Sequence, residues 1–129
     1  MASIRNHTST DVTKLLLVGD SGSGKTATLA TLANAGYNLR ILDFDDGLAI
    51  LPEFLLDSAV DRVSFVTLKD PIGKADAFRK SANLIGNWKD GDEDFGPVNK
   101  WTSKDVLVID SLTLMGEAAL RGALSFNNK

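Results

Sequence analysis

The feature that most limits how this chain can fold is a glycine-rich segment lying between an apolar run and a helix-forming run. Residues 19–26 read Gly-Asp-Ser-Gly-Ser-Gly-Lys-Thr, with leucines and valine before them and alternating alanine, threonine and leucine after them. We therefore expect a strand over about 14–19 and a helix over about 25–35. Gly36 is a typical residue to end that helix.

The spacing of this segment fits G-x-x-x-x-G-K-[ST], a phosphate-binding loop between a strand and a helix. Its glycines let successive backbone N–H groups point inward, and the helix adds its positive dipole end. Lys25 would reach the β- and γ-phosphates, and the Thr26 hydroxyl would bind Mg²⁺. The expected nucleotide-binding residues are Gly19, Asp20, Ser21, Gly22, Ser23, Gly24, Lys25 and Thr26.

Strand-like and helix-like segments alternate along the rest of the chain. We expect strands at 38–44, 62–68 and 105–110, helices at 48–57, 73–88 and 111–125, and an acidic surface loop at 89–97. The strands are continuous apolar runs, which are typical of a parallel sheet buried under helices on both faces. The sequence predicts a three-layer α/β fold.

Composition limits the alternatives. With 129 residues and a hydrophobic fraction of 43%, the chain can form one domain with a sizeable core. It has no cysteine, and no apolar run approaches the roughly 18–20 residues of a membrane span. We expect a polar tail at 1–12, a domain at 13–129 and a cytoplasmic location. The net charge of −3 predicts no overall attraction to nucleic acid.

A second motif lies in the last expected strand, where four apolar residues precede Asp110. This is the form of a Walker B strand, whose acid binds Mg²⁺ directly or through water. Ligands of parallel sheets sit at the carboxyl ends of strands, so Asp110 and Thr26 are expected to be the metal-binding pair. The alternative is that Asp110 only caps the following helix.

Together these motifs resemble the RecA-like P-loop ATPases. Val108-Ile109-Asp110-Ser111-Leu112-Thr113 is similar to the Walker B strand end of that family, whereas AAA+ and helicase-type enzymes have Asp-Glu there. More narrowly, residues 12–125 are similar to small phage-encoded ATPases that act with single-stranded DNA in recombination and annealing. The resemblance implies a Mg-dependent ATPase serving DNA recombination or repair in a bacterial cytoplasm, with single-stranded DNA and a homo-oligomer as partners.

The resemblance also implies a water-positioning acid. The family has Asp-x-Glu at the end of the strand after the P-loop helix, and Asp43-Phe44-Asp45 stands at the matching place. Lys25 and Asp45 are thus the expected catalytic residues, with Asp43 and Asp46 as alternatives to Asp45. Aspartate is one methylene shorter than glutamate, which predicts slow hydrolysis. The acids could instead form only a capped turn.

The family core has at least two further strands after the Walker B strand, so we expect this chain to hold the N-terminal half of that core. One of those strands normally lies between the P-loop strand and the Walker B strand. Either the strand at 105–110 pairs directly with the strand at 14–19, or a second chain supplies the missing strand, or the domain is marginally folded. A non-catalytic nucleotide-binding fragment is therefore an alternative function.

Two other hypotheses remain: a different class of P-loop enzyme, and a base-stacking role for the tryptophans. Another P-loop enzyme, such as a small-molecule kinase, would share the phosphate-binding loop. A GTPase is disfavoured because Asn99-Lys100-Trp101-Thr102 lacks the aspartate of N-K-x-D. Trp88 and Trp101, each next to a lysine, could form a base-stacking platform, but packing under a long loop is the favoured interpretation.

Overall fold

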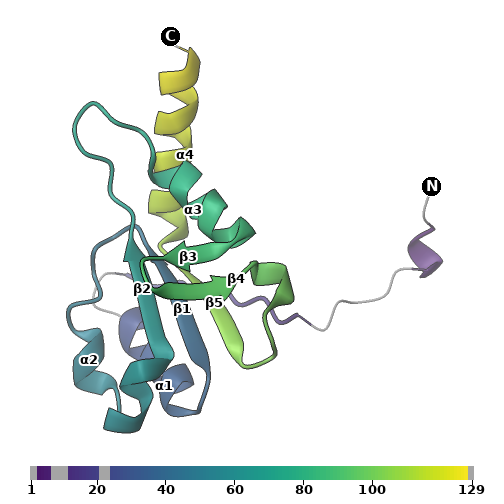
Figure 1. The fold of residues 1–129 in the computed structure, drawn as a ribbon, viewed down its shortest axis with the longest axis vertical. Coiled ribbons are helices and arrows are strands. Elements are labelled where there is room, and N and C mark those ends of the chain that lie inside the picture. Colours follow the sequence, from purple (N-terminus) through teal and green to yellow (C-terminus); the bar gives the residue numbers. More distant parts are fainter. Residues whose placement is uncertain (1–2, 7–11, 21–23, 128–129) are drawn as a thin grey trace.

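A three-stranded parallel sheet forms the centre of the molecule (Figure 1). The computed structural model describes residues 3–6, 12–20 and 24–127. The sheet contains β1 (Asn38–Asp43), β2 (Val63–Thr67) and β5 (Asp105–Asp110) in the order β2-β1-β5. Asp43 is level with Thr67 on one side and with Asp110 on the other, so the carboxyl ends of the strands form one edge. Three of the four predicted strands, at 38–44, 62–68 and 105–110, and their parallel arrangement are confirmed.

One face of the sheet is covered by α1 (Lys25–Asn34), α2 (Leu51–Phe54) and the 3₁₀ helix η2 (Asp57–Arg62). Alternate residues of β1 point to this face, and α1 packs onto them with its own apolar side. The core on this side consists of Leu29, Ala30, Ala33, Leu39, Ile41, Leu48, Leu51 and Ala59. The predicted helix at 25–35 is confirmed, and it ends before Gly36, where φ is 105°.

The predicted continuous helix at 48–57 is wrong, because the structure has a single turn in α2 followed by η2. Asn34 explains the break. Its side chain donates to the carbonyl oxygen of Phe54 at 3.0 Å and accepts from the N–H of Leu56 at 2.9 Å. These two bonds hold Leu55 extended, so the helix cannot continue through it.

The opposite face is covered by α3 (Ala77–Gly86) and α4 (Leu112–Asn127), which pack against each other. The core on this side consists of Leu42, Phe44, Leu68, Ala77, Leu84, Trp88 and Ala118. Helices on both faces give the predicted three layers at the level of an α/β fold. No helix among the described residues is long and apolar enough to cross a membrane.

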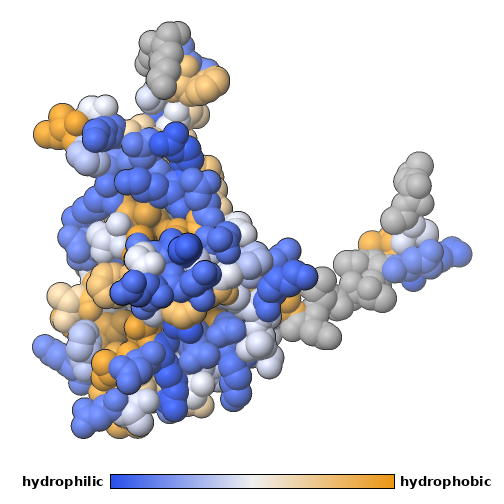
Figure 2. All heavy atoms as spheres, viewed as in Figure 1, coloured by the Kyte–Doolittle hydropathy of each residue, from blue (hydrophilic) through white to orange (hydrophobic). Residues whose placement is uncertain are grey.

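The second long helix begins at Ala77, four residues later than the predicted 73. Asp70 sets this start, because its Oδ1 accepts the N–H groups of Asp76 and Ala77 at 2.7 and 2.8 Å. Ile72, in the loop before this helix, is fully exposed. Figure 2 shows apolar surface at the tip of the same loop. The start of α4 agrees with the prediction, since the N–H of Leu114 donates to Ser111 Oγ at 3.4 Å.

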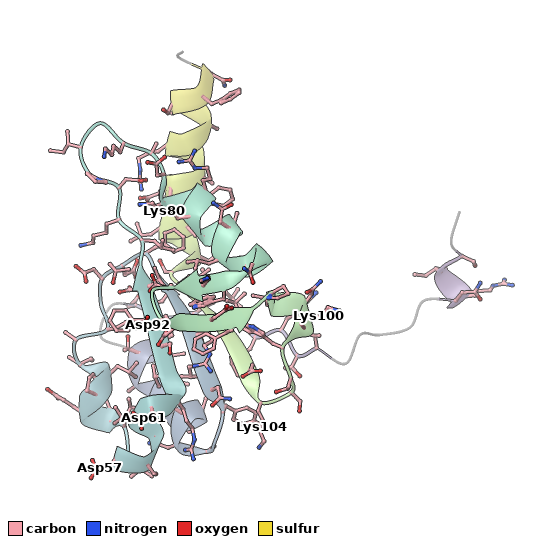
Figure 3. All side chains as sticks on the ribbon, in the orientation of Figure 1. Asp57, Asp61, Lys80, Asp92, Lys100 and Lys104 are labelled. Carbon is pink, nitrogen blue, oxygen red and sulfur yellow. The ribbon has the colours of Figure 1, made fainter. Side chains whose placement is uncertain are left out.

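The predicted surface loop at 89–97 is also wrong, because this segment forms most of an antiparallel hairpin. β3 (Trp88–Asp90) pairs with β4 (Glu93–Gly96), and the 3₁₀ helix η3 (Val98–Lys100) follows. Gly91 makes the tight turn possible by adopting φ 58°. Figure 3 shows the turn at Asp92 lying over β2 and Lys100 at the other end of the hairpin, so the hairpin crosses the sheet.

Contacts with the sheet hold the hairpin in place. Ser64 on β2 donates to Glu93 at 2.9 Å, and the guanidinium of Arg40 on β1 lies 3.6 Å from the centre of the Phe95 ring. Trp88 is fully buried with its ring centre 5.7 Å from that of Trp101. The packing interpretation of the two tryptophans is confirmed, and the stacking platform is not formed by Trp88.

The predicted strand at 14–19 is not formed: the described residues 12–20 have no strand conformation. Leu15, Leu16 and Val18 are 77%, 68% and 85% exposed. A strand needs a hydrogen-bonding neighbour, and β5 pairs only with β1 in the described part of the chain. The segment lies across a cavity from β5, as described next.

Candidate functional site

A cavity of about 590 Å³ lies between α1, β5 and the segment that precedes the glycine-rich loop. Apolar side chains from residues 15–18, from Leu29 and Leu32 of α1 and from residues 106–109 of β5 line part of it. The polar residues that line it are Gly19, Lys25, Thr26, Asp110, Ser111 and Thr113. These polar residues come from the start of α1 and from the carboxyl end of β5, where ligands of parallel sheets bind.

Lys25 is the first residue of α1 and is held against the loop that precedes the helix. Its ammonium donates to the carbonyl oxygens of Gly19 and Asp20, the latter at 2.9 Å. Gly24 precedes the helix with φ 89°, a conformation that side-chain-bearing residues rarely adopt. The lysine is half-buried and lines the cavity.

The structure brings together part of the predicted phosphate-binding set. Gly19, Lys25 and Thr26 line the cavity, whereas Asp20 and Gly24 do not. The predicted residues Ser21, Gly22 and Ser23 lie outside the described residues. The start of α1 nevertheless directs the N-terminal end of a ten-residue helix at this end of the cavity.

Asp110 reaches the same cavity from the last position of β5. Burial raises the pKa of its carboxyl group, and the charges of Asp45 and Asp43 raise it further, while the Lys25 ammonium acts in the opposite direction. The carboxylate therefore stands in a region with an excess of negative charge. A cation bound there would relieve this repulsion.

The three acids at the end of β1 have different environments. Asp43 is fully buried; its Oδ1 accepts the N–H of Asp46 at 2.8 Å and its Oδ2 accepts the Thr67 hydroxyl at 3.3 Å. Asp46 is exposed and pairs with Lys69 at 3.0 Å. Asp45 is also exposed and accepts a 3.1 Å hydrogen bond from the Ser111 hydroxyl. Asp45 does not line the cavity itself but bonds a residue that does.

Ser111 and Thr113 were not among the predicted site residues, although both line the cavity. Their position was the available signal, because they directly follow a strand end at the ligand-binding edge of a parallel sheet. The sequence placed Ser111 at the start of the last helix and within the family resemblance. It did not predict the bond to Asp45, which joins residues 66 apart in the chain.

The residues present could hold Mg²⁺ only as phosphate-binding loops do, with few protein ligands and with phosphate oxygens and water as the others. Among the described residues, no group of three or more His, Cys, Asp or Glu side chains could hold a metal ion. Thr26 and Asp110 do line the same cavity, and Mg²⁺ commonly takes one or two protein ligands, with water and phosphate oxygens as the others.

Comparisons with known proteins identify no family for this chain. No protein-family model matches the chain, and no curated protein or solved structure matches it.

Proposed function

We propose that this chain binds a Mg-nucleoside triphosphate, ATP in the first instance, at the polar side of its cavity. The observation that carries the proposal is the shared lining: Lys25 and Thr26 from the start of α1 and Asp110 from the end of β5 border one cavity. A cation, a hydroxyl and a carboxylate at that edge are the groups that a Mg-nucleotide requires.

Each of these residues has a distinct part in the proposal. Lys25 exchanges the carbonyl oxygens of Gly19 and Asp20 for phosphate oxygens, which are stronger acceptors because they are charged. The N–H groups of the first turn of α1 bind the phosphates at the positive end of the helix. The Thr26 hydroxyl and the Asp110 carboxylate hold the ion, which neutralises phosphate charge.

Hydrolysis is the second part of the proposal, and Asp45 is its water-positioning acid. Asp45 is exposed and tied to Ser111 on the cavity wall, whereas Asp43 and Asp46 have partners elsewhere in the fold. In this proposal, the Asp45 carboxylate next to Ser111 is the group that orients the attacking water. Lys25 and the ion would then stabilise the charge of the transferred phosphoryl group.

A non-catalytic nucleotide-binding protein is the second candidate, and one observation favours it. Asp45 does not itself line the cavity, so the acid needed for turnover is not yet in place. Mg-ATP binding without phosphate release would identify this candidate. Release of phosphate that depends on Lys25 would exclude it.

The biological setting follows only from the resemblance to RecA-like ATPases. On that basis we propose a role in DNA recombination or repair with single-stranded DNA as a partner. Self-association has structural support, because Leu112, Leu120 and Leu124 leave an apolar stripe exposed along α4. Light scattering of the protein and of Leu120→Glu tests self-association, and anisotropy of a labelled single strand, with and without Mg-ATP, tests DNA binding.

The deciding experiment is a thermal melt with and without saturating Mg-ATP. A ligand that binds only the folded state adds about 2.7 kcal/mol at a hundredfold excess over its dissociation constant. We expect an upward shift that Lys25→Ala removes and Lys80→Ala retains, because Lys80 lies on α3 and does not line the cavity (Figure 3). A melting midpoint that does not change with Mg-ATP, or an upward shift that persists in Lys25→Ala, would contradict the proposal.

A further inference from the structure

One side of the molecule carries a group of exposed apolar side chains. Five large ones around α2, η2 and β2 are between 48% and 58% exposed: Ile50, Phe54, Leu56, Val60 and Phe65. The backbones of Phe54 and Leu56 are bonded to the same side chain, Asn34, and η2 packs on β2, so the group occupies one region of the surface. Figure 2 shows apolar surface beside β2 and α2 on this side. Single exposed apolar residues are ordinary, whereas a contiguous group marks an interaction site.

The charge of this region is acidic. Residues 41–61 contain six Asp or Glu and no Lys or Arg. Glu53, Asp57 and Asp61 are exposed and form no ion pair with the described residues. We call these three acids and the five apolar residues the acidic patch. A partner surface that fits it is apolar and basic.

The loop between β2 and α3 has this complementary chemistry. Ile72 at its tip is fully exposed, Lys74 follows it, and Lys80 stands in the first turn of α3. Neither lysine forms an ion pair with the described residues, and we call the three residues the basic tip. Asp70 holds the base of the loop, because its carboxylate accepts two N–H groups at the start of α3 and pairs with Arg121 of α4. A loop held at its base loses less entropy when its tip binds.

The acidic patch and the basic tip lie toward opposite ends of β2. The 3₁₀ helix η2 leads into the amino end of that strand, and the loop leaves its carboxyl end. Figure 3 shows Asp57 and Asp61 at one end of the molecule and Lys80 toward the other. The two surfaces therefore meet only when they belong to different copies of the chain, arranged head to tail.

We propose that the basic tip of one chain docks on the acidic patch of a second copy. Ile72 packs among the apolar side chains near Phe54 and Phe65, while Lys74 and Lys80 face the acids of η2. The two copies contribute different surfaces, so the contact is heterologous and continues into a ring or an open row of copies. The inference rests on the self-association in the proposed function, but not on nucleotide binding.

Two complementary variants test this interface. Ile72→Glu removes the tip and leaves the patch, and Asp57→Lys/Asp61→Lys removes the patch and leaves the tip. In light scattering, the mass of the unsubstituted protein should rise with concentration, and each variant alone should associate at least about tenfold more weakly, as when a buried anchor is lost. An equimolar mixture of the variants should form a dimer and no larger species, because it contains one intact tip and one intact patch per pair.

Matched substitutions elsewhere control for charge and hydrophobicity. Ile4→Glu makes the same change at another exposed isoleucine, and Asp90→Lys/Asp92→Lys makes the same change of charge in the hairpin turn. Both should associate like the unsubstituted protein. All of the substituted side chains are exposed, so every variant should melt cooperatively. If the patch variant does not, Glu53→Lys, at the third acid of the patch, takes its place.

Three results would overturn the proposal. The first is an unsubstituted protein that stays monomeric at every concentration. The second is undiminished association of Ile72→Glu while Leu120→Glu weakens it, which would place the contact on α4. The third is a mixture of the two variants that stays monomeric. The Mg-ATP melt shift should persist in Ile72→Glu, and its loss in the unsubstituted protein would contradict nucleotide binding while leaving the mass measurements to decide the interface.

Discussion

The Ser111 hydroxyl donates a 3.1 Å hydrogen bond to the Asp45 carboxylate, which joins the end of β5 to the turn after β1. The backbone strengthens this junction, because the N–H of Phe44 donates to the carbonyl oxygen of Asp110 at 2.7 Å. The hydrogen bond places an exposed acid next to a residue of the cavity wall. This position distinguishes Asp45 from Asp43 and Asp46, whose carboxylates bind other parts of the fold.

The first prediction concerns Asp45→Asn. The amide can still accept the Ser111 hydrogen bond, but it cannot act as a base or attract the proton of an attacking water. We expect the Mg-ATP melt shift to persist while phosphate release falls by roughly 10²–10⁴-fold, the usual contribution of a positioned acid or base. Phosphate release and the melt are measured on the same preparation.

Asp46→Asn is the matched control for that experiment. Asp46 lies next in the chain, but its exposed carboxylate pairs with Lys69. Exposed ion pairs contribute about 0–1 kcal/mol, so neither the melt nor the turnover should change much. Unchanged turnover in Asp45→Asn, or an equal loss in both variants, would contradict the assignment of Asp45.

The second prediction is that Asp110→Asn stabilises the protein without nucleotide while weakening its response to Mg-ATP. Burial first, and then the charges of Asp45 and Asp43, raise the pKa of the Asp110 carboxyl. A raised pKa means that the ionised carboxylate is disfavoured in the folded state. Its penalty is absent below the ordinary aspartate range and grows as pH rises through the raised folded pKa.

Melts of Asp110→Asn and of the unsubstituted protein from acid to neutral pH test this predicted direction of the pH dependence of stability. The two should have similar midpoints at low pH, and the variant should become relatively more stable as pH rises. With Mg-ATP the order should reverse, because the variant loses a metal ligand. A variant that is less stable than the parent at neutral pH, without nucleotide, would argue against the charge excess.

The elements that sequence predicted correctly are those whose signals are local. The run before Asp110 is apolar and β-branched, and Ser111 is a common helix cap, so β5 and the start of α4 could be placed from their own residues. The errors involve distant partners. Arg40 under Phe95 and Ser64 bonded to Glu93 hold a hairpin in a segment whose acidic composition indicates a loop.

The same distinction applies to the site. Lys25, Thr26 and Asp110 belong to motifs with fixed spacing, so their shared cavity could be anticipated. The state of residues 14–18 could not, because an apolar run becomes a strand only when a neighbour accepts its hydrogen bonds. Asp43, Asp45 and Asp46 are similar in sequence, and only their partners in the fold distinguish them.

The third prediction is that Asp43→Ala destabilises the fold. The side chain is fully buried and satisfies the N–H of Asp46 and the hydroxyl of Thr67. Its removal leaves these groups without that partner, at a cost of about 1–3 kcal/mol. Denaturant unfolding should show this loss in Asp43→Ala but not in Asp45→Ala, whose side chain is exposed. Equal stability of the two variants would contradict a structural role for Asp43.

The fourth prediction compares two glycines that have free space around them. A Cβ at Gly24 or at Gly116 would meet no atom within 4 Å, so neither substitution to alanine causes a clash. Gly24 has φ 89°, where alanine costs about 1–2 kcal/mol through the backbone alone. Gly116 lies inside α4 and outside that φ range, where alanine adds roughly 0.5–1 kcal/mol of stability.

Denaturant midpoints should therefore move in opposite directions, down for Gly24→Ala and up for Gly116→Ala. The Mg-ATP melt shift should decrease only in Gly24→Ala, because the left-handed residue sets the path of the chain into Lys25. Equal midpoints for the two variants would mean that Gly24 is not held in this conformation in solution. A retained nucleotide shift in a destabilised Gly24→Ala would confine its role to folding.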